Sequence, residues 1–154
     1  MSSVREAGLI NDWSSEREEC DVSESLNSVG AITLFVGDPK RSKAFYEQVF
    51  ELPVLFEDEN SVAFRFENTI VNLLEEPAAH ELIEPATVGG NEAGSRLQLT
   101  IFVEDANAVV EHLREERGVE LLNGPIDRPW GMRTAAFADP DGHVWEVAQQ
   151  IGEG

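Results

Sequence analysis

The feature that most constrains this chain is an internal repeat. Four residues recur at a constant offset of 67 positions: Thr33, Phe35, Val36 and Asp38 return as Thr100, Phe102, Val103 and Asp105. The segment 67–70 also aligns with 141–144, at an offset of 74. Self-similarity of this length predicts two alike supersecondary units, which must pack together to bury their hydrophobic faces.

Hydrophobic periodicity predicts the same order of elements in both copies. The first copy reads as a strand at 31–36, a helix from the capping residue Asp38 to Phe50, and strands at 54–57, 61–66 and 69–75. The second copy reads as a strand at 96–103, a helix capped by Asp105 and stopped by Gly118, and strands at 120–123, 132–138 and 143–149. The sequence therefore predicts an α+β protein with two βαβββ modules.

The length of 154 residues favours one domain. We expect a flexible acidic leader at 1–28, a domain at 29–150 and a short tail at 151–154. Within the domain, module one covers 29–75, a connector covers 76–95 and module two covers 96–150. The connector, with its Pro and Gly residues, either folds over a binding site as a lid or simply links the modules.

Charge excludes several partners. The sequence has 30 acidic and 11 basic residues and a net charge of −19, so binding to nucleic acid or an anionic membrane is not expected. The acidic excess also favours a high-salt cytoplasm, because salt screens the self-repulsion.

Cys20 is the only cysteine, which excludes an intrachain disulfide and a cysteine zinc cluster. No signal peptide or apolar span is recognisable, so a cytoplasmic location is expected.

Strand alternation places five polar side chains on the sheet face that points away from the helices. They are Thr33, Asn72, Gln98, Thr100 and Glu146. A line of polar groups on that face is typical of a sheet that binds a ligand. The repeat also relates position 31 to 98 and position 72 to 146, which gives two symmetric pairs.

Two runs carry a resemblance to a known family. The run 32–38, with Phe45-Tyr46 after it, resembles the opening of glyoxalase and bleomycin-resistance proteins of the vicinal oxygen chelate superfamily, which also includes dioxygenases. The run 139–148 resembles their closing hairpin. The resemblance covers about residues 29–150. It implies a cupped eight-stranded mixed sheet, built from two βαβββ modules, in which a divalent metal usually chelates the substrate.

The resemblance also implies four metal-ligand positions, which fall on Ala31, Asn72, Gln98 and Glu146. Alanine has no donor atom, and the two amides are poor ligands for a transition metal. Glu146, with Gln98 beside it, is left as the candidate ligand for Mg, Mn, Ni or Zn. We therefore expect a degenerate site without a tightly bound metal. The alternative role of Glu146 is an acid that is satisfied by Gln98, Asn72 or Arg133.

Further candidates surround this site. If Ala138 pairs with His143 across the last turn, Arg133 faces the cup beside Glu146 and can hold an anionic or carbonyl group; otherwise it simply pairs with Glu146. We read Arg128 as a solvent-exposed charge. Phe35, Phe102 and Trp130 are candidate pocket walls, with core packing as the alternative.

Two functions fit these residues. The first is a protein that binds a small organic molecule in the cup without a tight metal. The alternative is a divalent-metal-dependent lyase or isomerase that resembles lactoylglutathione lyase, with Glu146 as ligand or base. A dioxygenase would need two histidines beside the carboxylate, and they are missing at these positions. The resemblance also implies a homodimer.

Overall fold

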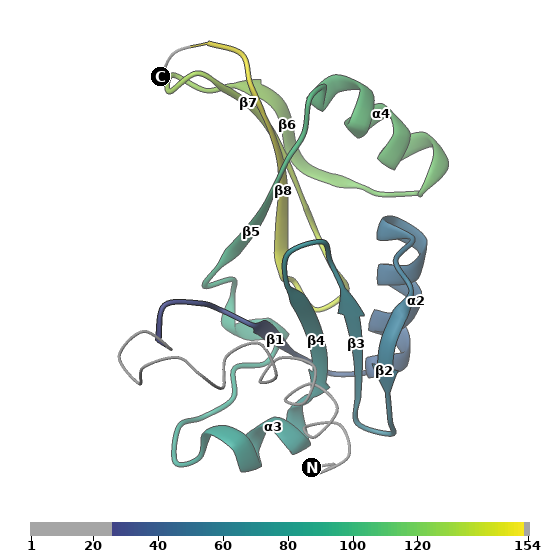
Figure 1. The fold of residues 1–154 in the computed structure, drawn as a ribbon, viewed down its shortest axis with the longest axis vertical. Helices are drawn as coiled ribbons and strands as arrows, with labels where there is room; N and C mark the ends of the chain where they lie inside the picture. The colour runs from purple at the N-terminus through teal and green to yellow at the C-terminus, as the bar shows by residue number, and fades with distance from the viewer. Residues whose placement is uncertain (1–25, 153–154) are drawn as a thin grey trace. The chain divides into compact units, whose positions relative to one another are not determined.

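A computed structural model describes residues 26–152, so all but the last three residues of the expected leader lie outside the described part. The elements, in chain order, are β1 (Ala31–Val36), α2 (Pro39–Phe50), β2 (Val54–Glu57), β3 (Ser61–Arg65), β4 (Ile70–Glu75), α3 (Glu76–Ile83), the 3-10 turn η2 (Asn91–Ala93), β5 (Gln98–Phe102), α4 (Ala106–Glu116), β6 (Leu121–Asp127), β7 (Met132–Ala138) and β8 (Val144–Gln150) (Figure 1). The α+β class and the two βαβββ modules are confirmed.

Each module forms its own four-stranded mixed sheet. The strand order is β1-β4-β3-β2 in the first sheet and β5-β8-β7-β6 in the second. In both sheets the strand that opens the module runs parallel to the strand that closes it, and the remaining pairs are antiparallel. A parallel pair needs a long crossover connection, which each module supplies through its helix.

The described chain divides into two compact units. The first contains residues up to Lys43 together with Leu52–Gly90, and the second contains Ala44–Glu51 together with residues from Asn91 onward. The second half of α2 therefore belongs to the same unit as the whole second module.

In the first unit, strand alternation separates the side chains into two faces. Leu34 and Val36 of β1 are buried, and Leu34 lies opposite the buried Leu73 of β4. Thr33 lies opposite Asn72 and Phe35 lies opposite Leu74, so these four side chains share the other face.

The connector contains a helix that the sequence analysis did not anticipate. Ala78 and Ala79 of α3 pack in one buried cluster with Leu74 of β4, and Phe35 and Val88 pack against this cluster. Figure 1 shows α3 beside the ends of β1 and β4. The connector thus covers the part of the first sheet where Phe35 and Leu74 lie.

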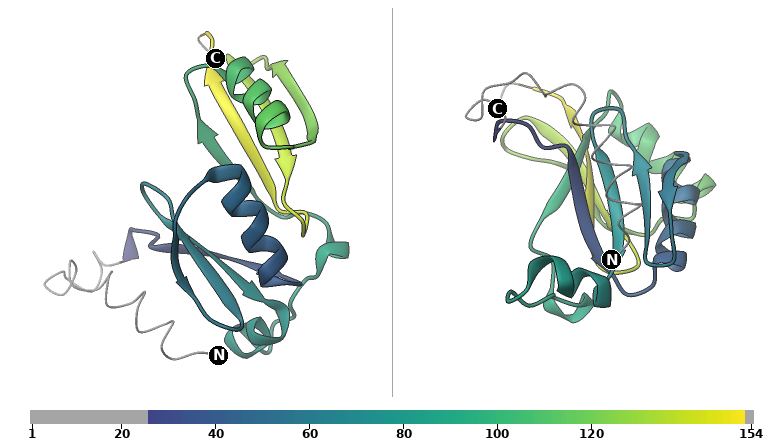
Figure 2. Two further views of the ribbon diagram at one scale, coloured as in Figure 1. Left: turned by 90° about the vertical axis from the view of Figure 1, so that its right-hand side faces the viewer. Right: turned by 60° about the horizontal axis from the view of Figure 1, so that its bottom comes forward.

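The core of the second unit lies under α4. Asp105 caps this helix by accepting a hydrogen bond of 3.0 Å from the backbone N–H of Ala108, as the sequence predicts. Val110 of α4 packs on Ala135 of β7 and Val147 of β8. Figure 2 shows α4 running along one face of this sheet.

The second half of α2 completes this core with aromatic side chains. Tyr46 lies edge-on to Trp145, at a centroid distance of 6.0 Å. Phe50 packs on the same indole at 4.7 Å and on Phe137 at 6.2 Å. Aromatic pairs in this distance range stabilise a core beyond their simple burial.

Candidate functional site

The face of the second sheet that points away from α4 holds four of the predicted site residues. Glu146 of β8 lies opposite Thr100 of β5 and opposite Ala136 of β7. Residues that are directly opposite on paired strands point to the same side of a sheet, and so do residues two apart along a strand. The face defined in this way, here called the open face, carries Gln98, Thr100, Phe102, Thr134, Ala136 and Glu146.

Thr100 and Glu146 form the clearest polar contact on the open face. The Thr100 hydroxyl donates a hydrogen bond of 2.9 Å to Oε1 of Glu146. Glu146 is half-buried and Thr100 is exposed. No residue in the described part of the chain bonds the second carboxylate oxygen, Oε2. One oxygen of Glu146 is thus held by the protein, and the other is available to a ligand.

The expected position of Arg133 is wrong. The structure pairs Ala138 with Val144 rather than with His143, which turns Arg133 to the helix side of the sheet, opposite Gln149. There the Arg133 guanidinium binds both carboxylate oxygens of Asp127, at 2.6 and 3.2 Å. The hydrogen bond between the two side chains lowers the pKa of Asp127 and raises the pKa of Arg133.

Arg128 is the arginine that bonds residues of the open face. Its Nε donates a hydrogen bond of 2.9 Å to the Thr134 hydroxyl, and its Nη2 lies 3.4 Å from Oδ1 of Asn123. The side chain is half-buried. The sequence offered no simple signal for this position, because Arg128 lies in the turn after β6, and the pairing of β6 with β7 is irregular.

Two aromatic side chains of the second module are strongly exposed. Phe102, at the end of β5, is 78% exposed, and Trp130, in the turn between β6 and β7, is 57% exposed. Exposed large apolar side chains beside polar groups are typical of binding surfaces. Core packing, the alternative for these two residues, does not fit their exposure.

The first unit places its site candidates differently. Asn72 is 4% exposed, and its buried Oδ1 has no hydrogen-bond partner among the described residues. Thr33 is exposed beside it on β1. Phe35 is partly buried against the cluster formed with α3, so here the core-packing alternative applies.

The donor atoms at the family's metal positions do not fit a tightly bound metal. Ala31 has none, and Asn72 belongs to the first unit, which leaves Gln98 and Glu146 in the second. Oε1 of Glu146 already accepts the Thr100 hydrogen bond. Within residues 26–152, no three His, Cys, Asp or Glu side chains gather as a metal site requires.

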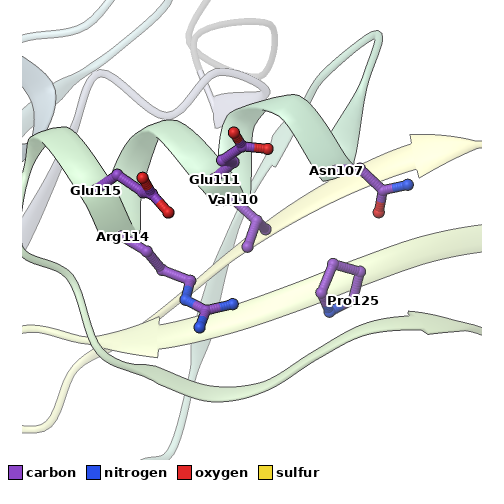
Figure 3. Close-up of a pocket in the computed structure, with 6 residues that line it drawn as sticks. All are labelled: Asn107, Val110, Glu111, Arg114, Glu115 and Pro125. Atoms are coloured by element: carbon purple, nitrogen blue, oxygen red, sulfur yellow. The ribbon is translucent and has the colours of Figure 1, made fainter.

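Two surface hollows lie on the other side of the second unit. One, of about 280 Å³, is lined by Asn107, Val110, Glu111, Arg114, Glu115 and Pro125 (Figure 3). A second, of about 290 Å³, lies along the exposed side of α4. In Figure 3 the side chain of Glu111 points away from the strands, and Arg114 points toward them. Neither hollow includes a predicted site residue.

Comparison with known families decides the identity of the fold. The model of the Glyoxalase/Bleomycin resistance protein/Dioxygenase superfamily matches residues 28–147. The chain belongs to this superfamily. The glyoxalase superfamily match spans both modules, as the two resembling runs in the sequence predicted.

Solved structures share the glyoxalase superfamily fold. A glyoxalase/bleomycin resistance protein/dioxygenase from Nocardioides has 21% identity and a TM-score of 0.73, over 86% of this chain and 92% of that one. A glyoxalase-related enzyme from Fulvimarina pelagi has 24% identity and a TM-score of 0.68, over 81% and 89%. A lactoylglutathione lyase from Agrobacterium tumefaciens has 17% identity and a TM-score of 0.64, over 80% and 93%.

These similarities concern the fold, because at such identities the site residues can differ completely. No curated protein sequence matches the chain. Among the helices of residues 26–152, none is long and apolar enough to cross a bilayer. The activity must therefore be argued from the site itself.

Proposed function

We propose that the chain binds a small organic molecule on the open face of the second sheet, with Glu146 as the ligand's hydrogen-bond acceptor and without a tightly held metal. The observation that carries this proposal is the 2.9 Å hydrogen bond from Thr100 to Glu146 on a half-exposed sheet surface. A carboxylate fixed by one donor keeps its second oxygen in a defined position. That oxygen can accept an N–H or O–H group of a ligand.

Apolar contact comes from the same face and the adjoining turn. Phe102 is two residues from Thr100 on β5, and Trp130 follows β6. Binding sites for small molecules combine apolar walls with a few polar groups that fix orientation. Gln98, two residues from Thr100 on the other side, adds both a donor and an acceptor.

The donor set supports binding without a metal. A catalytic zinc site normally has three good protein ligands, whereas the second unit offers one carboxylate and one amide at the family positions. A side-chain amide binds transition metals weakly. Glu146 is better suited to hydrogen bonding, because the Thr100 hydroxyl fixes one of its carboxylate oxygens.

A binding screen tests the proposal. A set of small aromatic alcohols, amides and acids is titrated into the wild-type chain, the Glu146→Gln variant and the Glu115→Gln variant, with chemical shifts as the readout. Glu115 is an exposed carboxylate on α4 and serves as the matched control. Compounds that bind the wild type should bind Glu115→Gln equally and Glu146→Gln about tenfold more weakly. Equal affinity for all three proteins would remove Glu146 from the site.

The alternative function is a divalent-metal-dependent lyase or isomerase similar to lactoylglutathione lyase. The unbonded Oε2 of Glu146 favours this alternative, because a base or metal ligand also needs an available oxygen. Its test is the formation of lactoylglutathione after addition of Ni²⁺ or Zn²⁺. Metal-dependent turnover that is abolished in Glu146→Gln would favour the lyase; a lack of turnover in the wild type would favour the binding protein.

A further inference from the structure

We infer that Arg128 is an oxyanion-binding residue, so that the ligand of the open face carries a carboxylate or phosphate group. This inference rests on the proposed function, because it names the chemical class of ligand for the same face. It adds a cationic contact that the family's metal positions do not include.

The turn between β6 and β7 fixes the backbone of Arg128. Its N–H donates a hydrogen bond of 2.7 Å to the carbonyl of Met132, and its carbonyl accepts one of 3.1 Å from Gly131. Gly131 has a φ of 85°, a conformation that suits glycine. The backbone of Arg128 is therefore held in a hydrogen-bonded hairpin turn.

Irregularity in β6 decides which of its residues share the open face with Asn123, one of the partners of Arg128. Asn123 pairs with Ala136, and Ile126 pairs with Thr134, so three residues of β6 span two residues of β7. In a regular strand, positions 123 and 126 would face opposite sides. The extra residue of a bulge removes this difference, and bulges often aim a side chain at a site.

The partners of Arg128 are neutral, whereas two other arginines of the second unit have carboxylate partners. Arg133 is neutralised by Asp127, and Arg117 lies 2.9 Å from the carboxylate of Glu51. Arg128 instead bonds a hydroxyl and an amide oxygen, and no ion pair of Arg128 occurs in the described part of the chain. Asp127 is adjacent in sequence, yet it binds Arg133 on the opposite side of the sheet.

An arginine in this state is ready to bind an anion. The guanidinium has five N–H donors. One on Nε donates to Thr134, and one on Nη2 donates to Asn123. The other three have no acceptor among the described residues. Carboxylate and phosphate groups match the planar fork of these donors. The net charge of −19 repels anions at long range, so an anionic ligand needs a local cation of this kind.

The position of Glu146 sets the orientation of the ligand. Glu146 is opposite Ala136, which is two residues from Thr134 on β7. Such diagonal neighbours lie roughly 7–8 Å apart between backbones. The ligand's anion is repelled by Glu146 and attracted by Arg128, whereas a hydroxyl or amino group donates to Glu146. The ligand class is therefore a hydroxy or amino acid, or the corresponding phosphate.

The test compares a carboxylate with its neutral amide. Phenyllactate and phenyllactamide are titrated into the wild type and into Arg128→Gln, Arg128→Lys, Arg114→Gln and Glu146→Gln, and inorganic phosphate serves as a second oxyanion. The readouts are the Kd ratio of amide to carboxylate and the NMR signals of the Arg128 guanidinium N–H groups. Arg114 is an exposed arginine on α4 and controls for the loss of one positive charge.

We expect the wild type and Arg114→Gln to prefer the carboxylate about tenfold. Arg128→Gln should lose this preference, and Arg128→Lys should keep part of it. A preference that survives in Arg128→Gln, or Arg128 guanidinium N–H signals of which none responds to either anion, would overturn the inference. In that case, the affinity for the amide in Glu146→Gln decides the proposed function. A lower affinity than in the wild type would still support it, and an equal affinity would contradict it.

Discussion

The hydroxyl of Tyr46 donates a hydrogen bond of 2.7 Å to Oδ2 of Asp139, and both residues are buried. The same hydroxyl accepts a hydrogen bond of 3.0 Å from the indole of Trp145. The other oxygen of Asp139 accepts from the backbone N–H groups of Asp141 and His143, each at 2.9 Å. One phenol thus ties the second half of α2 to the turn between β7 and β8.

Removal of this hydroxyl should destabilise the protein. In Tyr46→Phe, the buried carboxylate of Asp139 and the indole N–H of Trp145 lose their shared partner, and the expected loss of unfolding free energy is about 1–3 kcal/mol. Urea denaturation at neutral pH measures it. A loss below about 0.5 kcal/mol would show that water replaces the hydroxyl.

The same residue should control alkaline stability. Burial, together with the Asp139 carboxylate, raises the pKa of Tyr46 well above its usual range. The phenol ionises near pH 10 in the unfolded chain, so above about pH 10 the folded state binds more protons and stability falls. Below about pH 10 the contribution of Tyr46 is fully present. In Tyr46→Phe this alkaline loss should be reduced.

A spectroscopic measurement isolates the effect, because Tyr46 is the only tyrosine in the sequence. Tyrosinate absorbance should stay low while the circular dichroism is native and should rise only as the protein unfolds. Tyrosinate that forms near pH 10 in a protein with native circular dichroism would contradict the assignment.

Arg117 should stabilise the end of α2 mainly through carbonyl groups. Its Nη1 donates hydrogen bonds to the carbonyls of Val49, at 2.9 Å, and of Gln48, at 3.3 Å. The paired carboxylate of Glu51 is 65% exposed, so this ion pair contributes little. We expect a loss of about 1–2 kcal/mol for Arg117→Ala, against about 0.5 kcal/mol or less for Glu51→Gln. Equal losses in denaturation experiments would assign the stabilisation to the ion pair.

Gly124 should tolerate no side chain. A Cβ there would lie 2.4 Å from the carbonyl oxygen of Thr134 and 2.6 Å from Cα of Ala135, at a φ of 94°. We expect Gly124→Ala to cost more than about 3 kcal/mol, since strain and backbone overlap add. Gly142 is a matched control, with a similar φ of 89° and open space, and Gly142→Ala should cost about 1–2 kcal/mol. Similar melting temperatures for both variants would show that β6 can shift.

Element order was predictable because both modules repeat the same signals. Asp105, for example, marks the start of α4 by its capping side chain alone. The helix α3 was not predicted, although Pro77 in its first turn and the pair Ala78-Ala79 are typical of a helix start. The Pro and Gly residues of the connector are also typical of a linker, and this signal outweighed the short helix.

The orientation of the two arginines depended on single-residue shifts that composition does not reveal. A four-residue turn at 139–142 would pair Ala138 with His143, whereas the structure bonds Asp139 to His143 and leaves a three-residue loop with Gly142 at a φ of 89°. That shift turned Arg133 away from the open face. The same β7–β8 register places Thr134 on the open face, and the irregular β6 places Asn123 there, so that both partners of Arg128 lie on that face.

Metal content tests the central claim, which is ligand binding by Glu146 without a tightly held metal. The protein is purified without chelators and analysed by mass spectrometry, and the wild type and Glu146→Ala are then titrated calorimetrically with Ni²⁺, Zn²⁺, Mn²⁺ and Mg²⁺. We predict no stoichiometric metal and no tight binding in either protein. One equivalent of metal in the wild type that is lost in Glu146→Ala would contradict the claim and favour the lyase.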